Sequence, residues 1–305
     1  MPAPAGKTDR QQEGFILPRP CNIIERGGFI TSQRGIMGVS FTKMHGLGND
    51  FVILDGRTTP LSPSTTLISR LCDRRTGIGC DQLVTLSAPT RDGADVRVRF
   101  FNPDGSEAGA CGNASRCVAA LLGGSPTLQT QNGLLPTSQK NGLISVLMGT
   151  PHLDWQTIPL ARECDTARLP LHDGAACSMG NPHLTLFRSI EDAAALGPVL
   201  ETDPLFPERA NIGFAEILSP THIRLRVWER GAGLTLACGS GACAAVVNAA
   251  RRGLVERTCR VTMECGSLTI TWQDDGSVLM TGPAQTVFTG TLDESWLEKG
   301  QTTTP

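Results

Sequence analysis

The sequence lacks the marks of several protein classes. It has no apolar run near the ~18 residues that span a bilayer, and segment 1–20 lacks the apolar core of a secretory signal. Acidic and basic side chains nearly cancel, at 29 and 27, so no basic surface for nucleic acid is indicated. We therefore expect a cytoplasmic protein that acts on a small molecule and binds neither nucleic acid nor a membrane.

Signals for a cofactor or a metal are also missing. No two cysteines have C-x-x-C spacing, which argues against a zinc knuckle. The glycine-rich turns at 45–50 and 75–81 match neither G-x-G-x-x-G nor a P-loop. Pyridoxal phosphate needs a lysine, and the chain has only Lys7, Lys43, Lys140 and Lys299. We expect an enzyme that uses no cofactor and no metal.

Cysteine is the informative residue type. There are 11, an odd number in a chain without a recognisable secretory signal, which favours reduced thiols over a disulfide framework. Nine are interpreted as small buried apolar residues. The other two, Cys111 and Cys238, occupy equivalent positions in an internal repeat.

The chain repeats four segments in the same order. Residues 48–54 are echoed by 180–186, 79–83 more loosely by 213–217, 99–102 by 226–229, and Ala-Cys-Gly at 110–112 by 237–239. Each Ala-Cys-Gly precedes a small-residue segment of helical character. This pattern indicates a duplicated unit of about 130 residues. We predict an α+β fold of two pseudo-symmetric halves, each a curled, β-barrel-like sheet around a central helix.

Composition also suggests domain boundaries. Residues 1–38 lack sustained periodicity and are predicted to form a flexible N-terminal extension. The N-terminal repeat, with the first cysteine, is expected at 39–150, and the C-terminal repeat, with the second, at 151–288. A tail at 289–305 either returns to the N-terminal half or frays.

A cysteine at the start of a helix meets free backbone N–H groups and the positive end of the helix dipole. We therefore predict that the thiol pKa values of Cys111 and Cys238 fall toward neutral and that the same N–H groups hold a carboxylate. Two such thiols facing one α-carbon suggest that one removes a proton and the other adds one to the opposite face. The reaction would invert that carbon.

Three other interpretations remain open. A Cys–His nucleophilic enzyme would use His183 as its base, but leaves the second cysteine without a role. A redox dithiol is possible, although such pairs usually lie close together in sequence. A non-catalytic amino-acid-binding protein has no use for two polarised thiols, which are prone to oxidation.

Five motifs together resemble the diaminopimelate epimerase family: FTKMHGLGNDF, RRTGIGCDQ, FNPDGSEAGACGNASRC, MGNPHLTLF and RVWERGAGLTLACGSGACA. The resemblance covers about residues 39–290. It implies a pyridoxal-independent epimerase, usually a homodimer, that interconverts L,L- and meso-2,6-diaminopimelate in the synthesis of lysine and peptidoglycan precursors.

The resemblance also implies roles for individual residues. Cys111 and Cys238 fall on the catalytic acid/base pair. His183 and Glu229 would tune the two thiols. Asn102, Asn211 and the Glu229-Arg230 pair would bind the non-reacting end of the substrate, unless Glu229-Arg230 is only a structural ion pair. The substrate-contacting positions are Asn49, Gln82, Asn102, Gly112, Asn113, Asn181, Asn211, Glu229, Arg230, Gly239 and Ser240.

A few positions depart from the commonest family pattern. Ala114 stands where glycine is frequent, Cys80 where an apolar aromatic residue is usual, and Ser240 where threonine is frequent. Cys80 is thereby a candidate third reactive thiol. Among related activities, proline racemases usually carry histidine where this chain has Asn113, whereas a histidine-type racemase remains an alternative.

Overall fold

The computed structural model describes Met1, residues 38–109 and residues 111–298. Most of the predicted extension at 1–38 therefore lies outside the described residues, as do Ala110 and the end of the predicted tail, 299–305. The division of the chain into four segments stays a prediction.

Strands predominate in both halves of the described chain. The strands of the first half are β1 (Val39–Gly46), β2 (Asn49–Asp55), β3 (Gln82–Ser87), β4 (Val96–Phe101), β5 (Glu107–Ala108), β6 (Thr127–Thr130), β7 (Gly133–Lys140) and β8 (Leu143–Leu147). Those of the second half are β9 (Ala175–Ser178), β10 (Pro182–Leu186), β11 (Asn211–Ser219), β12 (His222–Glu229), β13 (Gly233–Thr235), β14 (Thr258–Met263), β15 (Gly266–Trp272) and β16 (Val278–Gly282). A last strand, β17 (Gln285–Leu292), follows.

Helices occur at matching places in the two halves. In the first half, α1 (Thr65–Cys72) lies between β2 and β3, and α2 (Gly112–Leu122) between β5 and β6. In the second half, a short 3-10 helix (Ile190–Asp192) and α3 (Ala193–Glu201) lie between β10 and β11, and α4 (Gly239–Arg251) between β13 and β14. The last helix is α5 (Glu294–Glu298). None of the helices in the described part of the chain is long and apolar enough to cross a membrane.

The two halves pair their strands identically. In the first, β1–β2, β3–β4, β4–β5, β6–β7 and β7–β8 are antiparallel, while β2–β3 and β4–β6 are parallel. In the second, the series from β9 to β16 has the same directions in the same order. This agreement confirms the predicted fold of two repeats, in which each curled sheet is open rather than a closed barrel.

The strand register corrects one detail of the predicted repeat. Phe51 pairs with Gln82 across β2 and β3, and His183 pairs with Asn211 across β10 and β11. Phe51 and His183 each lie two residues after the asparagine of the repeated Gly-Asn, so Gln82 is the counterpart of Asn211. The looser match proposed for 79–83 is therefore wrong. Alternating apolar residues look alike at several offsets, and only strand pairing fixes the register.

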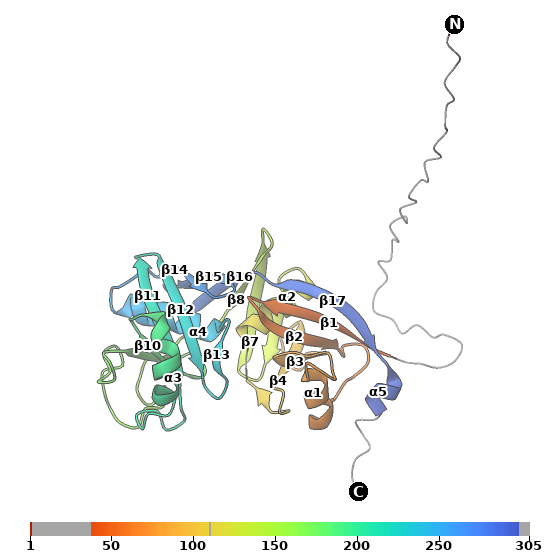
Figure 1. Ribbon diagram of the computed structural model, residues 1–305, viewed down its shortest axis with the longest axis horizontal. Coiled ribbons are helices and arrows are strands. Elements are labelled where there is room, and N and C mark those ends of the chain that lie inside the picture. The colour runs from red at the N-terminus through yellow and green to blue at the C-terminus, as the bar shows by residue number, and fades with distance from the viewer. Residues whose placement is uncertain (2–37, 110, 299–305) are drawn as a thin grey trace. The chain divides into compact units, whose positions relative to one another are not determined.

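The core of each half is built on its central helix. In α2, Ala114, Cys117 and Val118 are fully buried, and in α4 nearly every side chain is buried. Small side chains let each helix lie close against the strands that curl around it, with α2 touching β1, β2, β7 and β8, and α4 touching β9 to β12 and β14 to β16. Figure 1 shows α4 among the strands of its half.

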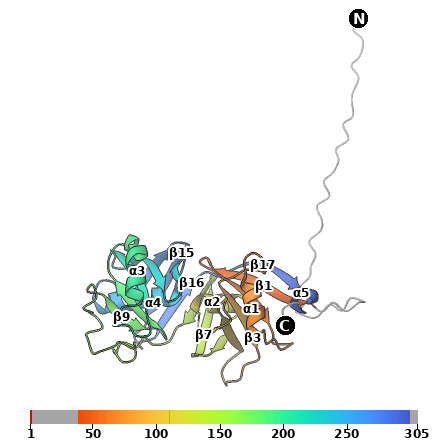
Figure 2. The same cartoon turned by 60° about the horizontal axis from the view of Figure 1, so that its bottom comes forward.

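Two strand pairs connect the halves. β16 pairs with β8, which joins the sheets in one continuous series. β17 pairs with β1 from Val39↔Leu292 to His45↔Gln285, with an irregularity after Lys43. Both views show β17 running along β1 (Figures 1 and 2). The C-terminal strand therefore belongs to the sheet of the first half.

Candidate active site

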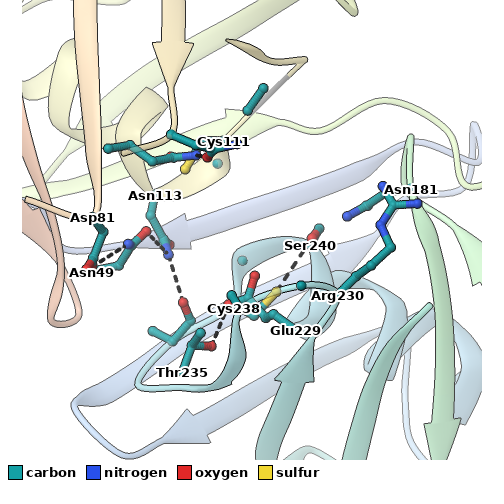
Figure 3. Close-up of a pocket in the computed structure, with 18 of the residues that line it drawn as sticks. Asn49, Asp81, Cys111, Asn113, Asn181, Glu229, Arg230, Thr235, Cys238 and Ser240 are labelled. Atoms are coloured by element: carbon teal, nitrogen blue, oxygen red, sulfur yellow. Dashed lines mark hydrogen bonds between the residues drawn. The ribbon is translucent and has the colours of Figure 1, made fainter. Parts of the chain in front are cut away.

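A cavity of about 1480 Å³ brings the two Ala-Cys-Gly turns together. Cys111 and Cys238 lie on opposite sides of it (Figure 3). Of the predicted site residues, only Asn211 and His183 are absent from its lining. The predicted residues that line it are Cys111, Cys238, Asn49, Gln82, Asn102, Gly112, Asn113, Asn181, Glu229, Arg230, Gly239 and Ser240.

Each cysteine is the residue immediately before a central helix. Cys111 (φ −145°, ψ 107°) precedes α2, and Cys238 (φ −116°, ψ 110°) precedes α4. The backbone is extended at both cysteines and turns helical at the following glycine, so the first N–H groups of each helix have no partner within the helix. The predicted helix starts are therefore confirmed, and both helix dipoles have their positive ends at this cavity.

The sulfur of Cys238 is held at the start of α4. The backbone N–H of Gly241 donates to Cys238 Sγ at 3.3 Å, and Ser240 Oγ lies 3.6 Å from the same sulfur. Gly241 has little room for a larger residue, since a Cβ there would lie 3.2 Å from Cys238 Sγ and 3.0 Å from a methyl of Val227. The close approach of backbone to sulfur depends on this glycine.

Burial reverses the expected direction of the thiol pKa values. Desolvation raises the pKa of Cys111 to about 11, against the opposing effect of the backbone N–H groups of Ala114 and Asn113. It also raises the pKa of Cys238 well above the ordinary value, and the nearby Glu229 carboxylate adds to the shift. The prediction of near-neutral thiols is therefore wrong here, because it counted the helix N-termini and not the cost of burying a thiolate.

Glu229 is the acidic neighbour of Cys238. Its carboxylate accepts a hydrogen bond from Thr235 Oγ1, and burial raises its own pKa (Figure 3). It forms no ion pair with Arg230 within the described residues. Arg230 Nη1 instead donates to the Glu208 carbonyl at 3.0 Å. The interpretation of Glu229-Arg230 as a structural ion pair therefore finds no support, and both side chains line the cavity.

Asn113 links the starts of the two helices. Its Nδ2 donates to the Ala237 carbonyl at 3.1 Å and to Asn49 Oδ1 at 3.2 Å. Asn49 Nδ2 in turn donates to Asp81 at 2.8 Å. Asn113 Oδ1 is buried and has no hydrogen-bond partner in the described protein. It lies 3.3 Å from the position a Cβ on Gly239 would occupy, beside the start of α4.

The remaining predicted polar residues form two hydrogen-bonded pairs. Gln82 Nε2 donates to Asn102 Oδ1 at 2.9 Å, and Gln82 Oε1 is buried without a partner among the described residues. On the opposite half, Asn181 Oδ1 lies 3.0 Å from His183 Nε2. These amides are therefore fixed in orientation on both sides of the cavity.

Asn211 and His183 lie behind the cavity wall. Asn211 Nδ2 donates to the Pro182 carbonyl and its Oδ1 accepts from the Arg230 N–H, both at 3.0 Å. His183 is 2% exposed, and burial lowers its pKa to about 3, so the ring is neutral. Asn211 thus positions the Arg230 backbone. Among the described residues, the ring of His183 forms a hydrogen bond with Asn181. The thiol-tuning role of His183 stays a prediction.

The sequence analysis missed a charged cluster beside Asn49. Asp50 accepts from Lys43 Nζ at 2.6 Å and from Arg74 Nη2 at 2.7 Å, while Arg74 also reaches Asp81 at 2.7 Å. These interactions hold the pKa of Asp50 well below its usual range, although burial acts in the opposite sense. The signal was present in the sequence, because both aspartates directly adjoin predicted site residues in HGLGND and GIGCDQ.

The sequence profile of the diaminopimelate epimerase family matches residues 41–153 and 175–287, one block in each half. A diaminopimelate epimerase of Gluconobacter oxydans (strain 621H) is 73% identical over 255 residues, which cover 84% of this chain and 99% of that protein. The chain belongs to the diaminopimelate epimerase family. A second diaminopimelate epimerase, from Acidiphilium cryptum (strain JF-5), is 55% identical over 84% of this chain and 97% of its own length.

Solved structures of more distant proteins share the family fold. A predicted epimerase from Pseudomonas aeruginosa superposes with a TM-score of 0.62 at 18% identity, over 83% of this chain and 99% of that one. A hydroxyproline epimerase from Agrobacterium vitis gives a TM-score of 0.60 at 14% identity, over 84% and 93%. At such identities, the likeness concerns the fold alone.

Proposed function

We propose that this protein interconverts L,L- and meso-2,6-diaminopimelate with two thiols and no cofactor. One observation carries the proposal: the two cysteines lie on opposite sides of one cavity, each at the start of the central helix of its half. Inversion at a carbon needs groups on both of its faces, and this arrangement supplies one from each repeat.

The helix starts provide the binding site for the reacting carboxylate. Gly112 and Asn113 line the cavity from one half, and Gly239 and Ser240 line it from the other. The free backbone N–H groups at a helix start can bind an anion such as this carboxylate. The same groups stabilise the enolate-like charge that develops as the α-proton leaves, because fixed dipoles need no reorganisation during the reaction.

The proton transfers then use both sulfurs. The thiolate of one cysteine takes the α-proton, and the thiol of the other donates a proton to the opposite face. In the reverse direction the two exchange roles, so one must be ionised while its partner stays protonated. The raised pKa values favour the protonated partner, and the backbone N–H of Gly241 stabilises a thiolate at Cys238.

The non-reacting end of the substrate carries an ammonium and a carboxylate. We assign it to the polar wall formed by Asn102, Asn181 and Arg230, all of which line the cavity. The guanidinium of Arg230 can hold a carboxylate with two parallel bonds. It forms no salt bridge within the described residues, so its charge is available to a ligand.

The deciding experiment is proton NMR of the reduced protein with L,L-diaminopimelate in D₂O, without added pyridoxal phosphate. We expect the α-proton signal to decay while the meso isomer appears. Histidine and proline serve as parallel substrates. The absence of exchange with diaminopimelate, or exchange with histidine alone, would refute the assignment while leaving the fold unchanged.

We further propose a cytoplasmic homodimer that contributes to lysine and peptidoglycan precursor synthesis, as the family resemblance implies. The exposed side chains of Val287 and Phe288 on β17, 57% and 47% accessible, support a partner surface there. Light scattering on the wild type and on Phe288→Glu tests the dimer. A monomeric wild type would exclude it.

A further inference from the structure

A second cysteine pair lies in the wall of the same cavity. Cys72 ends α1, and Cys80 follows a short loop. The two sulfurs are 3.5 Å apart, with Cys80 Sγ donating to Cys72 Sγ. Both side chains are buried, at 4% and 2% accessibility, and both border the cavity. Neither has a place in the proton transfers proposed for Cys111 and Cys238.

The two thiols of this pair differ in character. The S–H of Cys80 and the backbone N–H of Leu83 lower the pKa of Cys72, and the nearby Lys43 ammonium favours the thiolate form of both cysteines. The pKa of Cys80 is raised instead, because its S–H donates a hydrogen bond to Cys72 and because the side chain is buried. The Lys43 ammonium is fixed by Asp50 at 2.6 Å and by the Gly79 carbonyl. Cys72 is thus the more nucleophilic member, and Cys80 holds the proton.

The backbone holds the two cysteines together. The Cys80 N–H donates to the Cys72 carbonyl at 3.2 Å, and the Gly79 N–H to the Leu71 carbonyl at 3.0 Å. Gly79 itself has φ +77°, and a Cβ there would lie 2.8 Å from Arg74 Cα. A disulfide requires a sulfur separation of about 2.05 Å. Closing the remaining gap between the sulfurs needs a movement of roughly 1.5 Å.

We propose that Cys72 and Cys80 form a peroxide-reactive thiol pair, separate from the catalytic pair, that closes to a reversible disulfide. The oxidant is a small hydroperoxide admitted through the cavity. The Cys72 thiolate attacks its terminal oxygen, the O–O bond breaks, and the alkoxide or hydroxide leaves as alcohol or water after taking a proton. Cys72 becomes a sulfenic acid.

Cys80 completes the reaction. Its sulfur attacks the Cys72 sulfur, the S–S bond forms, the S–O bond breaks, and water leaves with the Cys80 proton. In total, two thiols and one hydroperoxide give one disulfide, one alcohol or water, and one further water. A dithiol reductant reverses the change by thiol–disulfide exchange.

The test uses hydrogen peroxide and the Cys111→Ala/Cys238→Ala double variant, so that the catalytic thiols contribute nothing. After peroxide treatment, free thiols are alkylated and the protein is digested with trypsin. Arg74 and Arg75 lie between the cysteines, so trypsin places Cys72 and Cys80 on separate peptides, 71–74 and 76–91. We expect these peptides to be joined, and to separate with dithiothreitol.

Single variants test the order of events. In Cys80→Ser, dimedone should label Cys72 after peroxide treatment; in Cys72→Ser, Cys80 should remain unlabelled. Circular dichroism verifies that each variant is folded. If a single variant does not fold, the Cys111→Ala/Cys238→Ala double variant alone decides. Phenylarsine oxide should bind to that double variant once per chain and protect both Cys72 and Cys80 from alkylation.

Two outcomes would overturn the proposal: Cys72 and Cys80 separately alkylated after peroxide, or a disulfide from either of them to another cysteine. No measurement relies on epimerase activity, so the result is independent of the proposed function.

Discussion

The side chain of Asn113, two residues after one candidate catalytic cysteine, donates a 3.1 Å hydrogen bond to the Ala237 carbonyl, immediately before the other. The two Ala-Cys-Gly turns are therefore joined by one amide. Their relative position determines whether both sulfurs reach opposite faces of the same carbon.

Asn113→Ala removes this connection. We expect kcat/KM for diaminopimelate to fall about 10- to 100-fold, because small displacements of reacting groups are costly. Stability should fall by about 1–2 kcal/mol through the lost buried hydrogen bonds. Asn248→Ala is the matched control: its buried amide donates to Ala175 O and Thr185 Oγ1 away from the cavity. A similar loss of kcat/KM in both variants would show that Asn113 contributes stability only.

Replacing either candidate catalytic cysteine tests the two-thiol mechanism. We expect Cys111→Ala and Cys238→Ala each to lower the epimerisation rate by about 10²- to 10⁴-fold, the usual size of an acid/base contribution. Cys177→Ala, at a fully buried cysteine of β9, controls for loss of a thiol as such. Epimerisation at close to the wild-type rate in either single variant would contradict the mechanism.

The Glu229 carboxylate raises the pKa of Cys238, so its removal should shift the thiol in the other direction. In the Cys111→Ala background, Glu229→Gln should make alkylation of Cys238 by iodoacetamide begin at lower pH. Glu107→Gln is the control, since Glu107 also borders the cavity but is paired with Arg99 at 2.7 Å. A pH profile unchanged by Glu229→Gln would mean that burial alone controls Cys238.

The buried thiols predict instability in alkali. Burial raises the pKa of Cys117, Cys177 and Cys243 to about 12, above the ordinary value of 9.0. The folded protein then holds these protons more tightly than the unfolded chain, so their contribution is complete below pH 9 and is lost as the pH rises from 9 toward 12. The slope approaches about 1.4 kcal/mol per pH unit for each thiol. Urea unfolding between pH 7.5 and 10.5 measures it, and Cys243→Ala should show a shallower decline.

Repeated motifs made the fold predictable. The two Ala-Cys-Gly turns located both helix starts, and the match of 99–102 with 226–229 agrees with the register that places Phe101 opposite Leu83 and Trp228 opposite Ile212. The weaker match of 79–83 failed, because strand register arises from pairing between distant segments and local alternation does not encode it.

The candidate site was only partly readable from the sequence. Residues next to glycine in repeated turns, such as Asn49 and Asn181, were found because their neighbours repeat. The cluster of Lys43, Asp50 and Arg74 was missed, since its members come from three separate segments that meet only in the folded sheet. The thiol pKa values were misjudged for a similar reason: burial is set by surrounding chain far away in sequence.

The pairing of β1 with β17 has a consequence for how the protein is made. β1 leaves the ribosome long before β17, its partner strand, because most of the chain lies between them. At a synthesis rate of about 5–20 residues per second, the delay is roughly ten seconds or more. Until then the nascent first half has an unpaired edge at β1, and its sheet is completed only when β17 arrives. Contacts between segments this remote in sequence favour a slow folding step.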